Sequence, residues 1–279
     1  MIDISKIDYS VLDSPRVSMH LFHPRSENIA VHGMDPERDI FITVDQGVNI
    51  GACFYTVNQS GPNILFFHGN GEIVGDYYDV GQMYNRMGIN FLPVDYRGYG
   101  RSDGTPTVTS MMKDCHLIFE FTKNWLKQRN FTGPLIVMGR SLGSASALEL
   151  AHNYKDEIDA LIIESGFAFA VPLLRLLGVD SDAIGFEEKQ GFRNIDKIVN
   201  FTNHVLIIHA EYDHIIPFTD GQALFDACQS KDKHLVKIKD ANHNDIMYAG
   251  LSDYMTAIKN LAKSLLINQD RMTEREKSN

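Results

Sequence analysis

The sequence predicts an α/β fold with a doubly wound, mostly parallel sheet, an antiparallel N-terminal hairpin and a small lid insertion. Short apolar runs alternate with segments of helical periodicity along most of the 279 residues. The runs are too short for helices, rich in Leu, Ile, Val and Phe, and end in glycine or polar residues, as strands buried on both faces do. Such alternation implies parallel strands with helices on both faces of the sheet.

The first predicted elements form a hairpin over residues 39–57, in which DIFITV and VNIGACFYTV flank a turn at Asp45-Gln46-Gly47. Later strands are expected in the short apolar runs at 63–67, 89–94, 135–138, 160–163, 204–208 and 234–238. Helical spacing covers the segments at 73–87, 109–128, 142–153, 219–229 and 253–266. A chain of this length with 44% hydrophobic residues can bury a full core.

One connection, residues 165–201, is longer than a crossover between parallel strands requires. It carries the apolar stretch FAFAVPLLRLLGV and then a polar stretch. We interpret it as a lid insertion, although a long loop with one helix would produce the same pattern. The chain then divides into an N-terminal extension (1–38), an α/β domain (39–266) and a polar tail (267–279) that is expected to fray.

Charge and composition exclude several classes of function. The 26 Lys and Arg against 36 Asp and Glu give a net charge of −10, whereas nucleic-acid binding requires clustered positive charge. No apolar run approaches the roughly 18 residues of a membrane-spanning helix, and no secretory signal is visible. Cys53, Cys115 and Cys228 are far apart and odd in number, unlike a disulfide framework. We therefore expect a cytoplasmic protein with neither an integral membrane segment nor a nucleic-acid partner.

Residues that directly follow the strands are candidates for chemistry, because ligands bind beyond the carboxyl ends of parallel strands. Residues 139–143 (GRSLG) form a G-x-S-x-G motif between the strand LIVM and the helical segment LGSASALELAHNY. This context predicts that Ser141 lies on a sharp strand–turn–helix bend with its hydroxyl exposed as a nucleophile. A serine that only caps the helix is the competing interpretation.

A serine hydroxyl is a weak nucleophile and needs a base that a third group orients. Asp213 follows the strand HVLIIH, and His243 follows the strand HLVKI. The order Ser, Asp, His matches one known arrangement of a catalytic triad. Glu164 and Asp245 are alternative acids, although Glu164 could anchor the lid and Asp245 could cap the last helix.

Two N–H donors should stabilise the oxyanion of an acyl-transfer reaction. The Leu142 N–H directly follows the nucleophile. The Asn70 N–H lies in the loop HGNGE after the first parallel strand, where glycines let the backbone bend. That loop lacks the lysine of a phosphate-binding loop, and His204, His209 and His214 recur at a spacing unsuited to zinc on a strand. We therefore assign no metal site.

The motifs FFHGNGE, DYRGYGRSDG, GRSLGS, EYDHIIP and NHND together resemble the serine hydrolases of the α/β-hydrolase superfamily over about residues 40 to 266. The chain is similar to a small-lid branch that includes α/β-hydrolase-domain depalmitoylases and bacterial esterase-like proteins. The resemblance implies the α/β-hydrolase fold, a triad of Ser141, Asp213 and His243, an oxyanion hole at Asn70 and Leu142, and no cofactor.

The expected reaction is hydrolysis of a small-molecule carboxylic ester or thioester through an acyl-Ser141 intermediate. A peptidase or an acyltransferase would use the same triad, and a non-catalytic binding module could retain the same fold. Phe167, Leu173 and Leu176 of the lid are expected to line an apolar pocket for a short or medium acyl chain. The competing interpretation is that these side chains cover the end of the sheet as satellite core.

Overall fold

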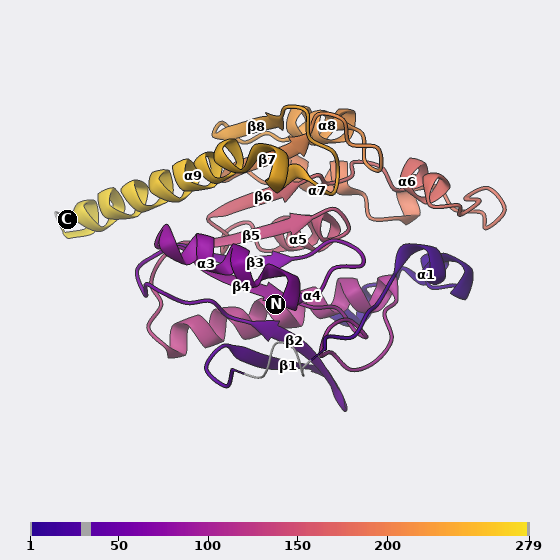
Figure 1. Cartoon of the computed structure of the whole chain (residues 1–279), viewed down its shortest axis with the longest axis horizontal. Helices are drawn as coiled ribbons and strands as arrows, with labels where there is room; N and C mark the ends of the chain where they lie inside the picture. Colours follow the sequence, from indigo (N-terminus) through magenta and orange to yellow (C-terminus); the bar gives the residue numbers. More distant parts are fainter. Residues whose placement is uncertain (1, 29–34, 278–279) are drawn as a thin grey trace.

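A mixed eight-stranded sheet with the order β1-β2-β4-β3-β5-β6-β7-β8 forms the centre of the computed structural model, which describes residues 2–28 and 35–277 (Figure 1). Its strands are β1 (Asp39–Asp45), β2 (Val48–Cys53), β3 (Asn63–Phe67), β4 (Asn90–Val94), β5 (Leu135–Arg140), β6 (Ala160–Glu164), β7 (His204–Ala210) and β8 (Lys233–Ile238). The pairs β1–β2 and β2–β4 are antiparallel, and the strands from β4 through β8 are parallel. The predicted fold class is therefore confirmed.

Helices cover both faces of this sheet. The α-helices are α1 (Pro15–Leu21), α3 (Tyr78–Arg86), α4 (Val108–Gln128), α5 (Gly143–Asn153), α6 (Ala170–Leu176), α7 (Asn194–Val199), α8 (Phe218–Ala227) and α9 (Ile246–Lys277). Short 3-10 helices are η1 (Ile4–Lys6), η2 (Ser10–Leu12), η3 (Val74–Tyr77) and η4 (Glu188–Gln190). Among the described helices, none is long and apolar enough to cross a membrane.

The alternation of side chains along β3 explains why its whole sequence is apolar after Asn63. Ile64 and Phe66 belong to a core cluster that includes side chains of α3 and α9, whereas Leu65 and Phe67 belong to a cluster with side chains of α4 and α5. Successive side chains of a strand point to opposite faces, so a strand with helices on both faces buries every residue. All five residues of β3 are buried.

The N-terminal residues pack against the core, a role that the sequence pattern did not reveal. Leu12, Val17 and Leu21 belong to the cluster that includes α4, and each is at most 2% exposed. Helix α1 has the start signal expected of a stable helix, since the Ser14 side chain accepts a hydrogen bond from the Val17 N–H and proline stands in its first turn.

The C-terminal helix differs from its predicted bounds. Helix α9 begins at Ile246, has non-helical dihedrals at Gly250, and continues through the polar tail to Lys277. Leu261 and Leu265 pack its middle against the sheet. Since adding a residue to an existing helix costs far less than nucleating one, the Lys, Arg and Glu of the tail extend the helix instead of fraying from residue 267.

The long connection between β6 and β7 contains two short α-helices, α6 and α7, with the 3-10 helix η4 between them. Ala170 and Leu174 of α6 are buried in the core, whereas Phe169 and Leu176 are exposed. Figure 1 shows α6 and α1 at the same end of the molecule, at the right of the view. Both contribute side chains to the cavity described below.

Candidate active site

Ser141 lies at the sharp bend between β5 and α5. Its φ of +50° is in the left-handed region, which is rare for residues other than glycine and marks backbone strain. The neighbouring glycines permit this bend. A Cβ atom at Gly139 would lie 2.3 Å from the Gly143 carbonyl oxygen, and a Cβ atom at Gly143 would lie 2.1 Å from the Phe67 carbonyl oxygen.

The structure brings together the three side chains of the expected triad. His243 Nε2 lies 3.0 Å from Ser141 Oγ, and His243 Nδ1 lies 2.7 Å from Asp213 Oδ2. Ser141 follows β5, Asp213 follows β7 and His243 follows β8, so all three come from the carboxyl ends of the strands. Each of the three residues is at least nine-tenths buried.

Hydrogen bonds hold Asp213 in its orientation. Its Oδ1 accepts from the backbone N–H groups of Ile215 at 3.0 Å and Ile216 at 2.8 Å, while Oδ2 faces His243. Burial opposes ionisation, but the hydrogen bonds and the attraction of His243 outweigh it and hold the pKa of Asp213 below its ordinary value. An ionised carboxylate only accepts, so Nδ1 of His243 carries the proton and Nε2 is free to accept from Ser141.

The two alternative acids have other partners. Glu164 accepts a hydrogen bond from Tyr254 Oη at 2.6 Å and lies 3.4 Å from Arg140 Nε. Burial raises the pKa of Glu164 above its usual range. Asp245 accepts a hydrogen bond from the Asn242 N–H at 2.6 Å. Among the candidate acids, Asp213 is therefore the carboxylate in contact with His243.

Arg140 joins three of the loops that surround Ser141. Its Nε lies 3.0 Å from Glu72 Oε1 in the loop after β3 and 3.4 Å from Glu164 at the end of β6, and its Nη2 donates to the His243 carbonyl at 3.0 Å. Burial alone would lower the pKa of Arg140, but the two carboxylates keep it charged. Sequence reasoning missed this role, although Arg140 and Glu164 end strands and Glu72 lies in the loop that follows β3.

Asn70 and Leu142 both line the cavity that contains Ser141. The Asn70 side chain turns toward the N-terminal residues, because its Oδ1 accepts from the His23 N–H at 2.8 Å and from Tyr99 Oη at 2.7 Å. Gly71, with a φ of +76°, reverses the chain directly after Asn70. Leu142 is the N-cap of α5, where the first helical N–H groups have no acceptor within the helix.

The catalytic cavity, as we call the space next to Ser141, has a volume of about 280 Å³. Leu173 and Leu177 form its lid wall, and Leu21 and His23 contribute from the N-terminal residues. Leu173 thus lies where the sequence predicted it, whereas Leu177, Leu21 and His23 were missed. The spacing of four residues places Leu173 and Leu177 on the same side of α6.

Phe167 and Leu176 do not line this cavity, which corrects our expectation for these two positions. Phe167 is fully buried and packs edge-on against Phe192, with ring centroids 5.3 Å apart. Leu176 is 57% exposed, because α6 buries Ala170 and Leu174 and thereby turns Leu176 toward solvent. Part of the lid is therefore satellite core, as the competing interpretation held.

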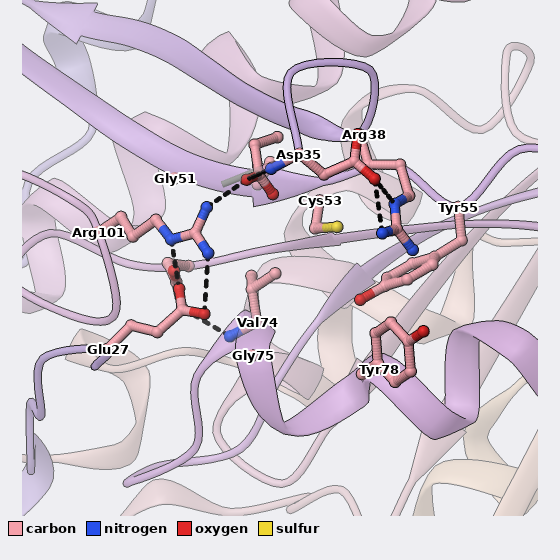
Figure 2. Close-up of a pocket in the computed structure, with 13 residues that line it drawn as sticks. Glu27, Asp35, Arg38, Gly51, Cys53, Tyr55, Val74, Gly75, Tyr78 and Arg101 are labelled. Carbon is pink, nitrogen blue, oxygen red and sulfur yellow. Dashed lines mark hydrogen bonds and ion pairs between the residues drawn. The ribbon is translucent and has the colours of Figure 1, made fainter. Parts of the chain in front are cut away.

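A second cavity of about 300 Å³ lies between the hairpin, the N-terminal residues and η3, and the triad takes no part in its wall. Figure 2 shows its charged side chains paired with one another: Arg101 with Glu27 and Arg38 with Asp35. Arg101 also pairs with Asp39 of β1. Through Arg101, which follows β4, the pairs with Glu27 and Asp39 connect the N-terminal residues to the hairpin.

Metal-ligating side chains are dispersed. Within the described ranges, no group of three or more His, Cys, Asp or Glu side chains is placed to hold a metal ion. His204 pairs with Asp232 at the start of β7, whereas His209 lies 3.6 Å from Asp213 behind the triad. Burial lowers the pKa of His209, so this histidine contributes no fixed charge beside the acid.

Sequence comparisons relate this chain to known hydrolases. The family model Hydrolase_4, described as serine aminopeptidase S33, matches residues 59–177. The human alpha/beta hydrolase domain-containing protein 17B is 31% identical over 242 residues, which cover 82% of this chain and 77% of that protein. The Danio rerio lysophosphatidylserine lipase ABHD12 is 30% identical over 247 residues, which cover 74% of this chain and 63% of the lipase.

The fold has close counterparts among solved structures. The Pyrococcus furiosus esterase Pf2001 superposes with a TM-score of 0.69 at 16% identity, over 88% of this chain and 99% of the esterase. The strand order, the bend at Ser141 and the relationship to the human protein over most of both chains lead to the same conclusion. This chain belongs to the α/β-hydrolase superfamily of serine hydrolases.

Proposed function

We propose that this protein hydrolyses carboxylic esters or thioesters through a covalent acyl-Ser141 intermediate. The hydrogen-bonded series Ser141, His243 and Asp213 at the wall of the catalytic cavity supports this assignment most strongly. Two relatives whose names include lipase or esterase support an acyl substrate.

In the acylation step, Ser141 Oγ attacks the carbonyl carbon, and its proton moves to His243 Nε2. The ionised Asp213 stabilises the imidazolium that forms. The tetrahedral intermediate then collapses, and His243 gives the proton to the leaving oxygen or sulfur as its bond to the acyl carbon breaks. In deacylation a water molecule takes the place of the alcohol or thiol, loses its proton to His243 and releases the acid, and the proton returns to Ser141.

The backbone N–H groups of Asn70 and Leu142 are the proposed oxyanion hole. Both residues line the cavity beside Ser141, and Leu142 stands at the N-terminus of α5, where the helix dipole favours negative charge. The hydrogen bonds of the Asn70 side chain to His23 and Tyr99 fix the loop that carries its N–H.

Leu173, Leu177 and Leu21 are the proposed wall for the acyl chain. All three are apolar, line the catalytic cavity and come from the lid and from α1. A volume of about 280 Å³ suits a short or medium acyl group. Leu173 keeps its expected role, and Leu177 and Leu21 take the place of Phe167 and Leu176.

A peptidase is the second candidate, since the matching family model is described as a serine aminopeptidase. An aminopeptidase needs a carboxylate for the free α-amino group of its substrate, and Glu72 is the acidic side chain of the catalytic cavity. Glu72 is already paired with Arg140 and accepts hydrogen bonds from the Gly69 N–H and Tyr77 Oη. This pairing favours ester over aminoacyl substrates.

The decisive experiment combines fluorophosphonate labelling with turnover of p-nitrophenyl esters, acyl thioesters and aminoacyl anilides. We expect labelling of the wild type and of Ser146→Ala, but not of Ser141→Ala. Ser146 is a matched control because it lies in α5, is buried and has a hydroxyl without a partner among the described residues. Folded wild-type protein that is neither labelled nor active would establish a binding module instead. Faster turnover of anilides than of esters would establish the peptidase.

We also infer a reducing, cytoplasmic location. Cys53, Cys115 and Cys228 are all free thiols and all buried. Free buried cysteines are the usual state in reducing compartments.

A further inference from the structure

A third cavity of about 280 Å³ lies between α3, the start of α9 and the sheet. Its wall is rich in aromatic side chains: Phe66, Tyr77, Tyr84, Phe91, Tyr248 and Tyr254. We call it the aromatic cavity. Ligand sites of this kind are mostly apolar with a few placed polar groups, and the polar groups here are those nearest the triad.

The aromatic cavity adjoins the catalytic cavity on the side of the catalytic base. Arg140 and Asn244 line both cavities, and Asn244 directly follows His243 and is exposed. The two cavities are therefore neighbours, with Arg140 and Asn244 between them.

Two hydroxyl groups and two carboxylates at the polar edge of the aromatic cavity are already paired. Tyr77 Oη donates a hydrogen bond to Glu72, and Tyr254 Oη donates one to Glu164. Both carboxylates also pair with Arg140. Among the described residues, Arg140 Nη1 is buried and has no acceptor. Since Glu72 and Glu164 offset the charge of Arg140, the aromatic cavity does not suit an anion.

Reaction chemistry decides which part of a substrate would enter this cavity. His243 Nε2 must give its proton to the leaving oxygen or sulfur, so the leaving group lies on the His243 side of the scissile bond. The lid wall at Leu173 and Leu177 bounds the catalytic cavity, whereas the aromatic cavity lies past Asn244.

We propose that the aromatic cavity is the leaving-group subsite, which binds the apolar body of the alcohol or thiol released from the ester. This inference rests on the proposed function and divides the substrate between the two cavities. The exposed ring of Tyr248, 95% accessible in the free protein, covers the bound group at the cavity mouth.

The test uses two ester series. In one, acetate is esterified with ethyl, butyl, hexyl or octyl alcohol; in the other, ethanol is esterified with acids of the same lengths. Met247→Trp and Val80→Trp fill the aromatic cavity from α9 and α3. Met255→Trp is the matched control, because Met255 is a half-buried methionine of α9 that packs on the same core but lines neither cavity.

We expect kcat/KM of the wild type to rise by up to about fourfold per methylene of the alcohol until the cavity is full. Both cavity-filling variants should reduce the hexyl-to-ethyl ratio in the acetate series by about tenfold, and should leave the ratios of the acid series within about twofold. Met255→Trp should keep both wild-type ratios. A wild type indifferent to the alcohol, or variants that change only the acid series, would overturn the assignment.

A binding measurement separates this inference from the proposed function. If the protein hydrolyses no ester, the proposed function fails, yet calorimetric binding of 1-octanol still decides whether the aromatic cavity holds an alcohol. Binding to wild type and Ser141→Ala that Met247→Trp abolishes supports the subsite. Absence of binding, or binding that Met247→Trp leaves intact, refutes it.

Discussion

Replacement of Asp213 by asparagine exchanges one oxygen for an NH₂ group and tests the orientation of His243, the proposed catalytic base. In the native site, Asp213 Oδ1 accepts from the N–H groups of Ile215 and Ile216, and Oδ2 faces His243 Nδ1. The amide of asparagine must keep its oxygen toward the two backbone donors, since the opposite orientation would direct an NH₂ group at two N–H groups. Its NH₂ group then faces His243 Nδ1 and donates to it.

That exchange reverses the tautomer of the imidazole. With Nδ1 as the acceptor, Nε2 carries the proton and no longer accepts from Ser141, although all heavy atoms stay in place. We expect Asp213→Asn to lower kcat on the order of 10⁴-fold, equivalent to about 5.5 kcal/mol in the activation free energy.

The assay is kcat for p-nitrophenyl butyrate at neutral pH, with circular dichroism to establish that the variant is folded. Asp245→Asn is the matched control, since its amide oxygen can still accept from the Asn242 N–H, and it should retain nearly wild-type activity. Retention of more than a tenth of wild-type kcat in Asp213→Asn would refute the reasoning. If Glu164→Gln abolished kcat and Asp213→Asn lowered it only mildly, Glu164 would be the acid of the proposed triad.

Three further predictions concern the nucleophile, the lid wall and a buried carboxylate. Ser141→Ala should lower kcat on the order of 10⁶-fold, and adding His243→Ala should cost little more because the two act as a unit; additive losses in esterase assays would contradict this. Leu173→Asp should flatten the increase of kcat/KM with acyl length, while Leu176→Asp, at an exposed position outside the cavity, should not; equal effects of both variants would remove Leu173 from the acyl wall. Burial alone would raise the pKa of Glu149, but ion pairing and hydrogen bonds outweigh it and lower that pKa to about 2. The ionised Glu149 therefore stabilises the fold above the unfolded-state pKa near 4.5, and this contribution is lost as the pH falls toward 2. Urea unfolding between pH 6 and 2 should therefore show a loss of about 3 kcal/mol that Glu149→Gln lacks, and parallel pH profiles would contradict it.

Local pattern was sufficient to predict the strands and to select the residues proposed as nucleophile, acid and base. The run at 63–67 coincides with β3 because a strand buried on both faces needs an unbroken apolar sequence, and Pro62 and His68 bound it. The G-x-S-x-G motif is enough to predict the bend at Ser141, since only glycine fits at the motif positions on either side of it. Each of these two signals lies within a few consecutive residues of the chain.

The side of a helix that meets a cavity is not a local property. The apolar stretch of the lid contains leucines at 173, 174, 176 and 177, and the sequence did not distinguish Leu176 from Leu177. Helix α6 packs into the core cluster that contains Phe167 and Phe192, so that Leu174 is buried, Leu173 and Leu177 line the cavity, and Leu176 is exposed.

The sequence by itself determined the fold class, the strands and the residues offered as nucleophile, acid and base. Only the tertiary structure decided that Arg140 ties the loops of Glu72, Glu164 and His243 together, that Leu21 joins the catalytic cavity, and that an aromatic cavity adjoins it. The physical reason is the range of the interactions. Apolar periodicity and turn chemistry act between near neighbours along the chain, whereas ion pairs and cavities depend on how segments far apart in sequence pack against one sheet.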